Sequence, residues 1–294
     1  MKILIGHDGS QSADAALVDL QRSGLPHEAE ALIVSVADIM MVPATPNYEL
    51  AGQALLSRRV ASGLMNAQKQ TARVLKEAGE FAGRARDQVR AYFPDWSVRV
   101  ETLAGSPALE LINRANEWRP DLIVVGSHGR SAVSRFILGS VSKKVVMDSD
   151  YSVRVSRGDV ERNLNRPPRI VIGVDGSTES EQAIRAVGSR IWPHGTEVRL
   201  IAVENGSAST AAGQMLAWAE NALSVIGLKV SVGMEKGDPR RVLIDQAKAW
   251  QADSIFVGGR RFCSVLERFQ LGSVATALVT KAHCSVEVAR NAGK

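Results

Sequence analysis

The chain has 294 residues, 45% of them hydrophobic, and a formal net charge of +5 at neutral pH. This length suits two domains of about 100–200 residues each. The charge excess is mild and forms no block of like charges, so no nucleic-acid partner is expected. With two cysteines and five scattered histidines, neither a disulfide framework nor a zinc site is expected. No apolar run reaches about 18 residues and no secretory signal pattern is present, so we expect no membrane span and a cytoplasmic protein.

Short apolar runs alternate with helical periodicity along the first 157 residues. The predicted strands span about 2–6, 30–36, 97–102, 121–125 and 152–156. The predicted helices span about 11–22, 58–92, 107–118 and 140–148, and Ser106-Pro107 is a typical helix start in which Ser caps free amides. This regular succession predicts a parallel sheet with helices on both faces, and right-handed crossovers then give a doubly wound fold.

The chain also repeats itself. The segment from Ile3 to Ser10 recurs from Ile170 to Ser177, and three further motifs recur in the same order. A polar stretch containing Pro167-Pro168 lies between the copies and indicates a linker, because proline pairs end regular structure. We therefore predict two tandem α/β domains, residues 1–157 and residues 168–294, hereafter half one and half two.

The strongest candidate site is a glycine-rich loop at the end of the predicted fourth strand. It runs Gly126-Ser127-His128-Gly129, then nine residues, then Gly139-Ser140-Val141 at a helix start. Glycine lets the backbone approach a ligand closely, and a helix start offers free amides and a positive dipole to phosphate oxygens. His128, Arg130 or Arg135 could add to such a site. With a strand order of 3-2-1-4-5, this loop would meet the turn at Asp8 in the ligand crevice. Asp-Gly-Ser is also ordinary turn and capping chemistry, so the role of Asp8 stays open.

These motifs resemble the universal stress protein family, in particular its tandem members, over nearly the whole chain. The resemblance implies Rossmann-like domains of the adenine nucleotide α-hydrolase-like type, each with five parallel strands, which bind ATP, possibly with Mg²⁺, and form homodimers. The resemblance also implies which residues would line the ATP site. On the adenine side these are Gly6, His7, Asp8 and Val36, and beside the adenosine Val125 and Gly126. Gly129 would lie near the ribose and phosphates, and the phosphates would contact Gly139, Ser140 and Val141.

Half two departs from this pattern. Gly258 and Gly272-Ser273 are retained, but Arg261 takes the place of the second glycine and the spacer is one residue longer. A side chain would then lie where the backbone should approach phosphates. Arg260 and Arg261 could instead bind an anion directly or fill the empty site. We predict one ATP per chain, bound in half one.

The function predicted from these observations is an ATP-binding protein with a regulatory or stress-response role. No general base or activated nucleophile is evident around the glycine loop, so rapid turnover is not expected. A slow ATPase or adenylating enzyme of the same fold, and a ligand-free assembly scaffold, are the alternatives. The last strand of each half, with Val153 and Val155 or Val286 and Val288, would be a sheet edge. We predict that these strands pair within the chain around a pseudo-twofold axis, and that they can pair again between chains.

Overall fold

A computed structural model describes residues 1–39, 58–129, 138–157, 166–204, 209–259 and 271–291. Half one contains β1 (Lys2–Gly6), α1 (Gln11–Leu20), β2 (Glu30–Asp38), α2 (Arg58–Tyr92), β3 (Ser97–Gly105), α3 (Pro107–Trp118), β4 (Leu122–Gly126), α4 (Ser140–Asp148) and β5 (Ser152–Ser156). Half two contains β6 (Arg169–Val174), α5 (Thr178–Gly188), β7 (Glu197–Glu204), α6 (Ser209–Val225), β8 (Lys229–Lys236), α7 (Pro239–Ala249), β9 (Ser254–Gly258), α8 (Ser273–Lys281) and β10 (Ser285–Ala289). The predicted order of elements in half one is confirmed.

Capping side chains set several helix starts. The Ser10 hydroxyl accepts a hydrogen bond from Ala13 N at the start of α1, and Asp238 accepts one from Arg240 N at the start of α7. The prediction that the Ser106 side chain caps α3 is wrong, because its hydroxyl makes no capping hydrogen bond. Pro107 does not explain this difference, because Asp238 caps α7 with Pro239 at the same position.

The ten strands of the described residues form one sheet in the order β3-β2-β1-β4-β5-β10-β9-β6-β7-β8. Each half thus contributes five parallel strands in the predicted order, and β5 pairs with β10 in antiparallel orientation. The predicted pairing of the last strands within the chain is confirmed. The idea that the same strands pair again between chains is wrong, because β5 and β10 each have a neighbour on both sides. A homodimer stays a prediction that requires another surface.

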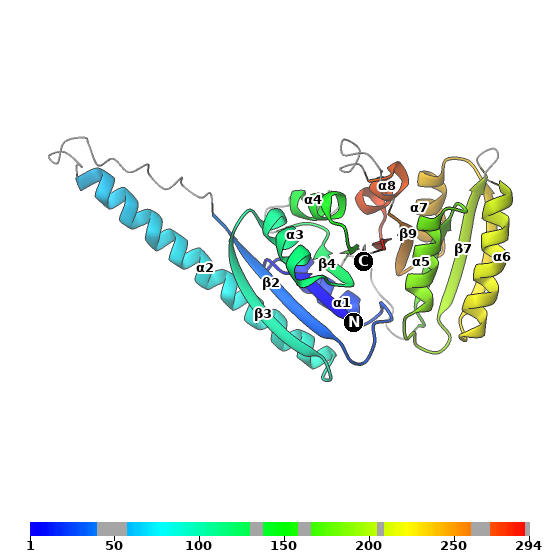
Figure 1. The fold of residues 1–294 in the computed structure, drawn as a ribbon, viewed down its shortest axis with the longest axis horizontal. Helices are drawn as coiled ribbons and strands as arrows, with labels where there is room; N and C mark the ends of the chain where they lie inside the picture. The colour runs from blue at the N-terminus through cyan, green and yellow to red at the C-terminus, as the bar shows by residue number, and fades with distance from the viewer. Residues whose placement is uncertain (40–57, 130–137, 158–165, 205–208, 260–270, 292–294) are drawn as a thin grey trace.

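The helices cover both faces of the sheet (Figure 1). On the face covered by α3, α4, α7 and α8, a single apolar core runs from half one into half two through Val153, Val155, Val286 and Val288. The opposite face has two separate cores, one under α1 and α2 and one under α5 and α6. Figure 1 shows the N-terminal part of α2 extending beyond the sheet. No helix within the described ranges combines the length and hydropathy needed to cross a membrane.

Between these two cores, the side chains that alternate with the central valines are charged. Arg154 of β5 lies opposite Glu287 of β10, and neither side chain is more than 1% exposed. The Arg154 guanidinium also contacts Asp19 of α1 at 2.7 and 3.2 Å, while Arg190 after α5 forms an ion pair with Glu287. We call Asp19, Arg154, Glu287 and Arg190 the central charge row. Their charges alternate in sign across the boundary between the halves.

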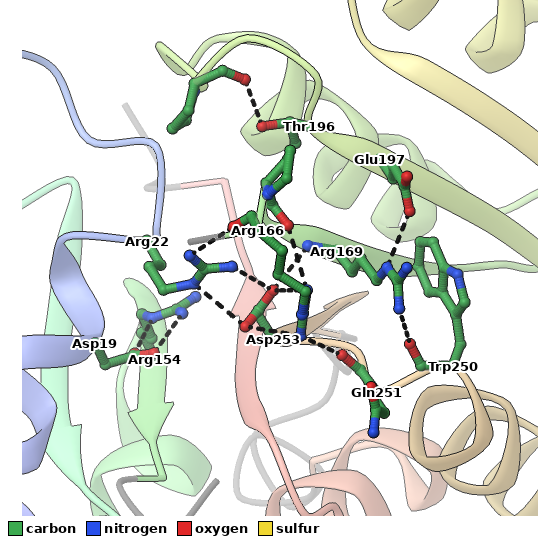
Figure 2. Close-up of polar contacts among 12 residues, drawn as sticks. Asp19, Arg22, Arg154, Arg166, Arg169, Thr196, Glu197, Trp250, Gln251 and Asp253 are labelled. Atoms are coloured by element: carbon green, nitrogen blue, oxygen red, sulfur yellow. Dashed lines mark hydrogen bonds and ion pairs between the residues drawn. The ribbon is translucent and has the colours of Figure 1, made fainter. Parts of the chain in front are cut away.

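A second ionic cluster ties the linker to both halves. The carboxylate of Asp253 lies just before β9 and accepts hydrogen bonds from Arg22 at 3.0 Å and from Arg166 at 2.9 Å. Figure 2 shows both arginines converging on Asp253, with the Asp19–Arg154 pair beside them. Because Arg22 belongs to half one and Asp253 to half two, this cluster fixes the relative position of the halves.

Candidate functional site

The Asp8 turn and the glycine loop meet at the carboxyl ends of β1 and β4, which are neighbours in the sheet. The Oδ1 atom of Asp8 accepts a hydrogen bond from Ser10 N at 3.0 Å, so Asp8 has a role in the turn, while Ser10 caps α1. Its other oxygen, Oδ2, lies only 3.0 Å from the position that a Cβ on Gly129 would occupy. The carboxylate therefore lies beside Gly129 of the glycine loop, and the turn and ligand interpretations of Asp8 are compatible.

Hydrogen bonds hold the glycine loop against the starts of α1 and α4. His128 N donates to the Ser12 hydroxyl at 3.2 Å, and the Ser12 and Ser127 hydroxyls lie 3.4 Å apart. Gly139 N donates to Ser127 O at 2.8 Å. The loop thus closes onto the N-terminus of α4, the arrangement that places backbone amides around an anion.

Not all of the candidate glycines face the crevice. A Cβ on Gly126 would lie 2.9 Å from the backbone of Ser12, and one on Gly6 would lie 2.9 Å from Leu111. These two glycines allow α1 and α3 to pack closely on the strands, which requires no ligand. A Cβ on Gly139 would meet the loop backbone at 3.2 Å, close to His128 Cα. The described ends of the glycine loop, residues 126–129 and Gly139, therefore pack closely against each other.

His7 differs from the other candidates because its ring points to α1. Gly9 N donates to Nδ1 at 3.3 Å, which leaves the proton on Nε2, 3.1 Å from Asp14 Oδ1. Burial lowers the pKa of His7, although Asp14 favours the charged form. The ring lies on the face of the sheet opposite to Val36 and Val125, so His7 could reach a ligand in the crevice only through its backbone.

Val36 and Val125 belong to the core beneath α3 and α4, and Val141 packs against that core. Ser140 is exposed at the first position of α4. The described residues therefore supply an apolar floor and an open helix start beside Asp8. Arg130 and Arg135 lie outside the described residues. The described ranges also contain no group of three or more His, Cys, Asp or Glu side chains that could hold a metal ion.

The structure reveals a cavity of about 480 Å³ at the matching place in half two, which the sequence reasoning did not anticipate. It is lined by the repeated motifs: Gly173, Asp175, Ser177, Ile201, Val203, Pro239, Val257, Gly258, Gly272 and Ser273. Within the described part of the chain, a Cβ on Gly272 would meet nothing within 4 Å. The recurring Asp-Gly-Ser and Gly-x-Pro motifs are the sequence signal for this cavity, although Arg261 replaces the second loop glycine there. Arg260 and Arg261 are not among the described residues.

The lining of this cavity differs chemically from the crevice of half one. Glu179 of α5 stands where half one has Ser12, and Asp175 is also in the lining. The Asp175 carboxylate accepts hydrogen bonds from the amide and hydroxyl of Ser177, at 3.0 and 2.5 Å. Both ionisable groups that the structure describes in this lining are thus acidic, and the described ranges place no cation there.

The fold and site define a class: a tandem pair of doubly wound α/β domains, each with an aspartate turn facing a glycine-bearing helix start at the point where strand order reverses. The model of the Universal stress protein family matches residues 1–157 and 168–290. The chain therefore belongs to the universal stress protein family.

Relatives align with the whole chain or with about half of it. Universal stress protein Rv2005c of Mycobacterium tuberculosis is 26% identical over 311 aligned positions, which cover 98% of this chain and 96% of the relative. Universal stress protein MJ0531 of Methanocaldococcus jannaschii is 28% identical over 159 positions, or 52% of this chain and 80% of the relative. Among solved structures, a universal stress protein from Archaeoglobus fulgidus superposes with a TM-score of 0.69 at 22% identity, covering 99% of this chain and 98% of that one. This last likeness supports the fold alone.

Proposed function

We propose that this chain is an adenine nucleotide-binding universal stress protein, with a regulatory or stress-response role in the cytoplasm, and that ATP binds in the crevice of half one. The observation that carries the proposal is the approach of Asp8 to Gly129 beside the exposed start of α4. Val36 and Val125 would contact the base, and Asp8 the base or the ribose. The amides of Gly129, Gly139, Ser140 and Val141 would hold the phosphates, with or without Mg²⁺.

Regulation fits the described crevice better than catalysis does. The ring of His7 is buried and neutral, and the ring of His128 is hydrogen-bonded to Ser127 at 2.9 Å. Neither histidine has both a nucleophile and an orienting carboxylate beside it, as nucleophilic catalysis by a triad requires. Slow hydrolysis of bound ATP or adenylation is the enzymatic alternative, and release of phosphate or pyrophosphate during prolonged incubation would favour it. A ligand-free scaffold would purify without nucleotide, which mass spectrometry can check.

The main alternative to one bound nucleotide per chain is a second binding site in the half-two cavity. Its volume is within the range of small-molecule sites, about 300–1,000 Å³, and its lining repeats the motifs of half one. Its acidic lining argues against a polyphosphate, whereas Arg260 and Arg261 follow β9 and argue for an anion. We expect one ATP per chain, because only half one has both loop glycines.

Calorimetric titration of nucleotide-stripped full-length protein with ATP tests the proposal. Asp8→Asn should abolish most of the binding, whereas the matched variant Asp175→Asn should leave it unchanged. Gly272→Ala provides a second control, since the described structure accommodates its methyl group without movement. A stoichiometry near two that falls to one in Gly272→Ala would place a second nucleotide in half two. Absence of binding at millimolar ATP would refute the proposed function.

A further inference from the structure

Helix α2 lies directly against the turn that carries Asp8. A Cβ on Gly9 would lie only 2.5 Å from Cδ1 of Phe81, so the Phe81 ring packs on the turn where Gly9 leaves room. Gly9 has a φ of +75°, a conformation that favours glycine. The guanidinium carbon of Arg84 lies over the same ring, 5.0 Å from its centroid. Phe81 therefore forms a bridge between the candidate site and an exposed cation.

Arg84 differs from Arg73 and Arg86 of the same helix in having no acidic partner among the described residues. Arg73 forms an ion pair with Glu77, and Arg86 forms one with Asp87. Within the described ranges, no carboxylate lies within ion-pair distance of Arg84. Its charge reaches the buried ring of His7 beside the same turn, where burial is the main cause that lowers the pKa of His7 and Arg84 adds to it. The guanidinium is therefore exposed beside the Asp8 turn and is not neutralised by a described carboxylate.

Half two provides an internal comparison. There the turn at Gly176 contacts Ala211 and Ala212 of α6, and Ala212 lines the cavity. This point of the fold is thus a wall of the binding crevice. α6 carries one glutamate and no lysine or arginine, whereas α2 carries eight lysine and arginine residues against three acidic ones. Only half one therefore has a basic helix at this wall.

We propose that Arg84 is the cation that makes half one selective for phosphate-bearing ligands, and that Phe81 positions it. This inference rests on the proposed nucleotide function. A guanidinium offers several N–H donors to phosphate oxygens, and the aromatic face restrains it without neutralising it. The Asp8 carboxylate would repel a polyphosphate, and the charge of Arg84 would offset that repulsion. α2 is then part of the binding site as well as a structural element of half one.

The test compares ATP, AMP and adenosine on the full-length, nucleotide-stripped protein. Arg84→Gln should weaken ATP binding about tenfold, the size of one charge-assisted hydrogen bond, and should change adenosine binding less than about twofold. Its ATP affinity should also depend less on salt. Phe81→Leu keeps the charge but removes the ring, and should weaken ATP binding by a smaller factor. Arg86→Gln removes the same charge from the same helix and should leave all three affinities unchanged.

The outcomes separate this inference from the proposed function. If the wild-type protein binds none of the three ligands, the proposed function fails, and this inference with it. If the wild-type protein binds ATP and Arg84→Gln binds it equally well, only the role of Arg84 is refuted. Equal losses for ATP and adenosine, or equal effects of Arg84→Gln and Arg86→Gln, would also overturn it, since they would indicate a structural or general field effect. Melting temperatures of the variants identify any loss of folding.

Discussion

Replacing Arg154 by Met should cost this protein more stability than most single substitutions. Asp19 accepts two hydrogen bonds from Arg154 and one, of 2.8 Å, from Ser156, and its side chain is fully buried. Arg154→Met removes both of the hydrogen bonds that Arg154 donates to that carboxylate and also removes the contact to Glu287. Although burial opposes the charged form, Asp19 and Glu287 raise the pKa of Arg154, so the guanidinium is charged.

The magnitude follows from burial. Breaking a buried ion pair by removing one partner costs roughly 3–5 kcal/mol, because the remaining charge is left uncompensated. For domains of this size, each kcal/mol shifts the melting temperature by about 2–4 °C, so Arg154→Met should lower it by roughly 10 °C. An exposed pair behaves differently. Arg185, 67% exposed on α5, pairs with Glu181 one turn away, and Arg185→Gln should cost about 0.5 kcal/mol or less.

Urea unfolding of the full chain, followed by tryptophan fluorescence, measures both variants. The double variant Asp19→Leu with Arg154→Met removes both charges and should recover much of the loss, since apolar replacement of a buried pair is often neutral. If Arg154→Met loses no more stability than Arg185→Gln, or if the double variant is worse than the single one, the central charge row does not stabilise the fold as we argue.

Two other substitutions test the junction and the titrating groups. Burial, and then the charges of Lys248 and Arg157, lower the pKa of His283 below 6.5. The folded protein therefore favours the neutral ring. The stability that this provides is complete above about pH 6.5 and is lost as the pH falls through the lower pKa of His283 in the folded protein. His283→Phe should therefore flatten the decline of the urea midpoint between pH 7 and 5 relative to wild type; an unchanged decline would exclude His283 as its source. Gly24 has a φ of +67°, and its Cβ would lie 2.6 Å from the indole of Trp192 in half two. Gly24→Ala should lower the free energy of unfolding by more than about 1 kcal/mol, and a neutral result would show that the halves dock loosely there.

Local sequence pattern predicted the elements of half one closely. The predicted bounds of α2, α3, α4 and β5 match the observed ones, because hydrophobic period and cap residues are encoded within each segment. β2 and β3 extend two and three residues beyond the predicted ends at 36 and 102, to Asp38 and Gly105. These extra residues pair with each other, Asp38 with Gly105. Such pairing between distant segments leaves no local signal.

The candidate site was predicted only in part, because the directions of its side chains also depend on distant segments. The meeting of Asp8 with Gly129 followed from topology, since carboxyl ends of neighbouring parallel strands share one edge of the sheet. The direction of the His7 ring depends on Asp14, and the packing of Gly126 depends on α1. Motif matching assigned both residues to the ligand. A motif gives positions, whereas the direction of each side chain is decided by packing partners that lie elsewhere in the chain.

The central charge row was equally invisible in the sequence, yet it decides which strands can meet. Arg154 lies directly opposite Glu287, with Val153 opposite Val288 and Val155 opposite Val286. Two β5 strands paired in this register would place Arg154 against Arg154, and two β10 strands would place Glu287 against Glu287. Like charges opposed in a buried pair are destabilising, and the valines on either side would fit all three combinations equally well. The apolar pattern thus supplies the affinity of the junction, while one charged position selects the pairing of half one with half two.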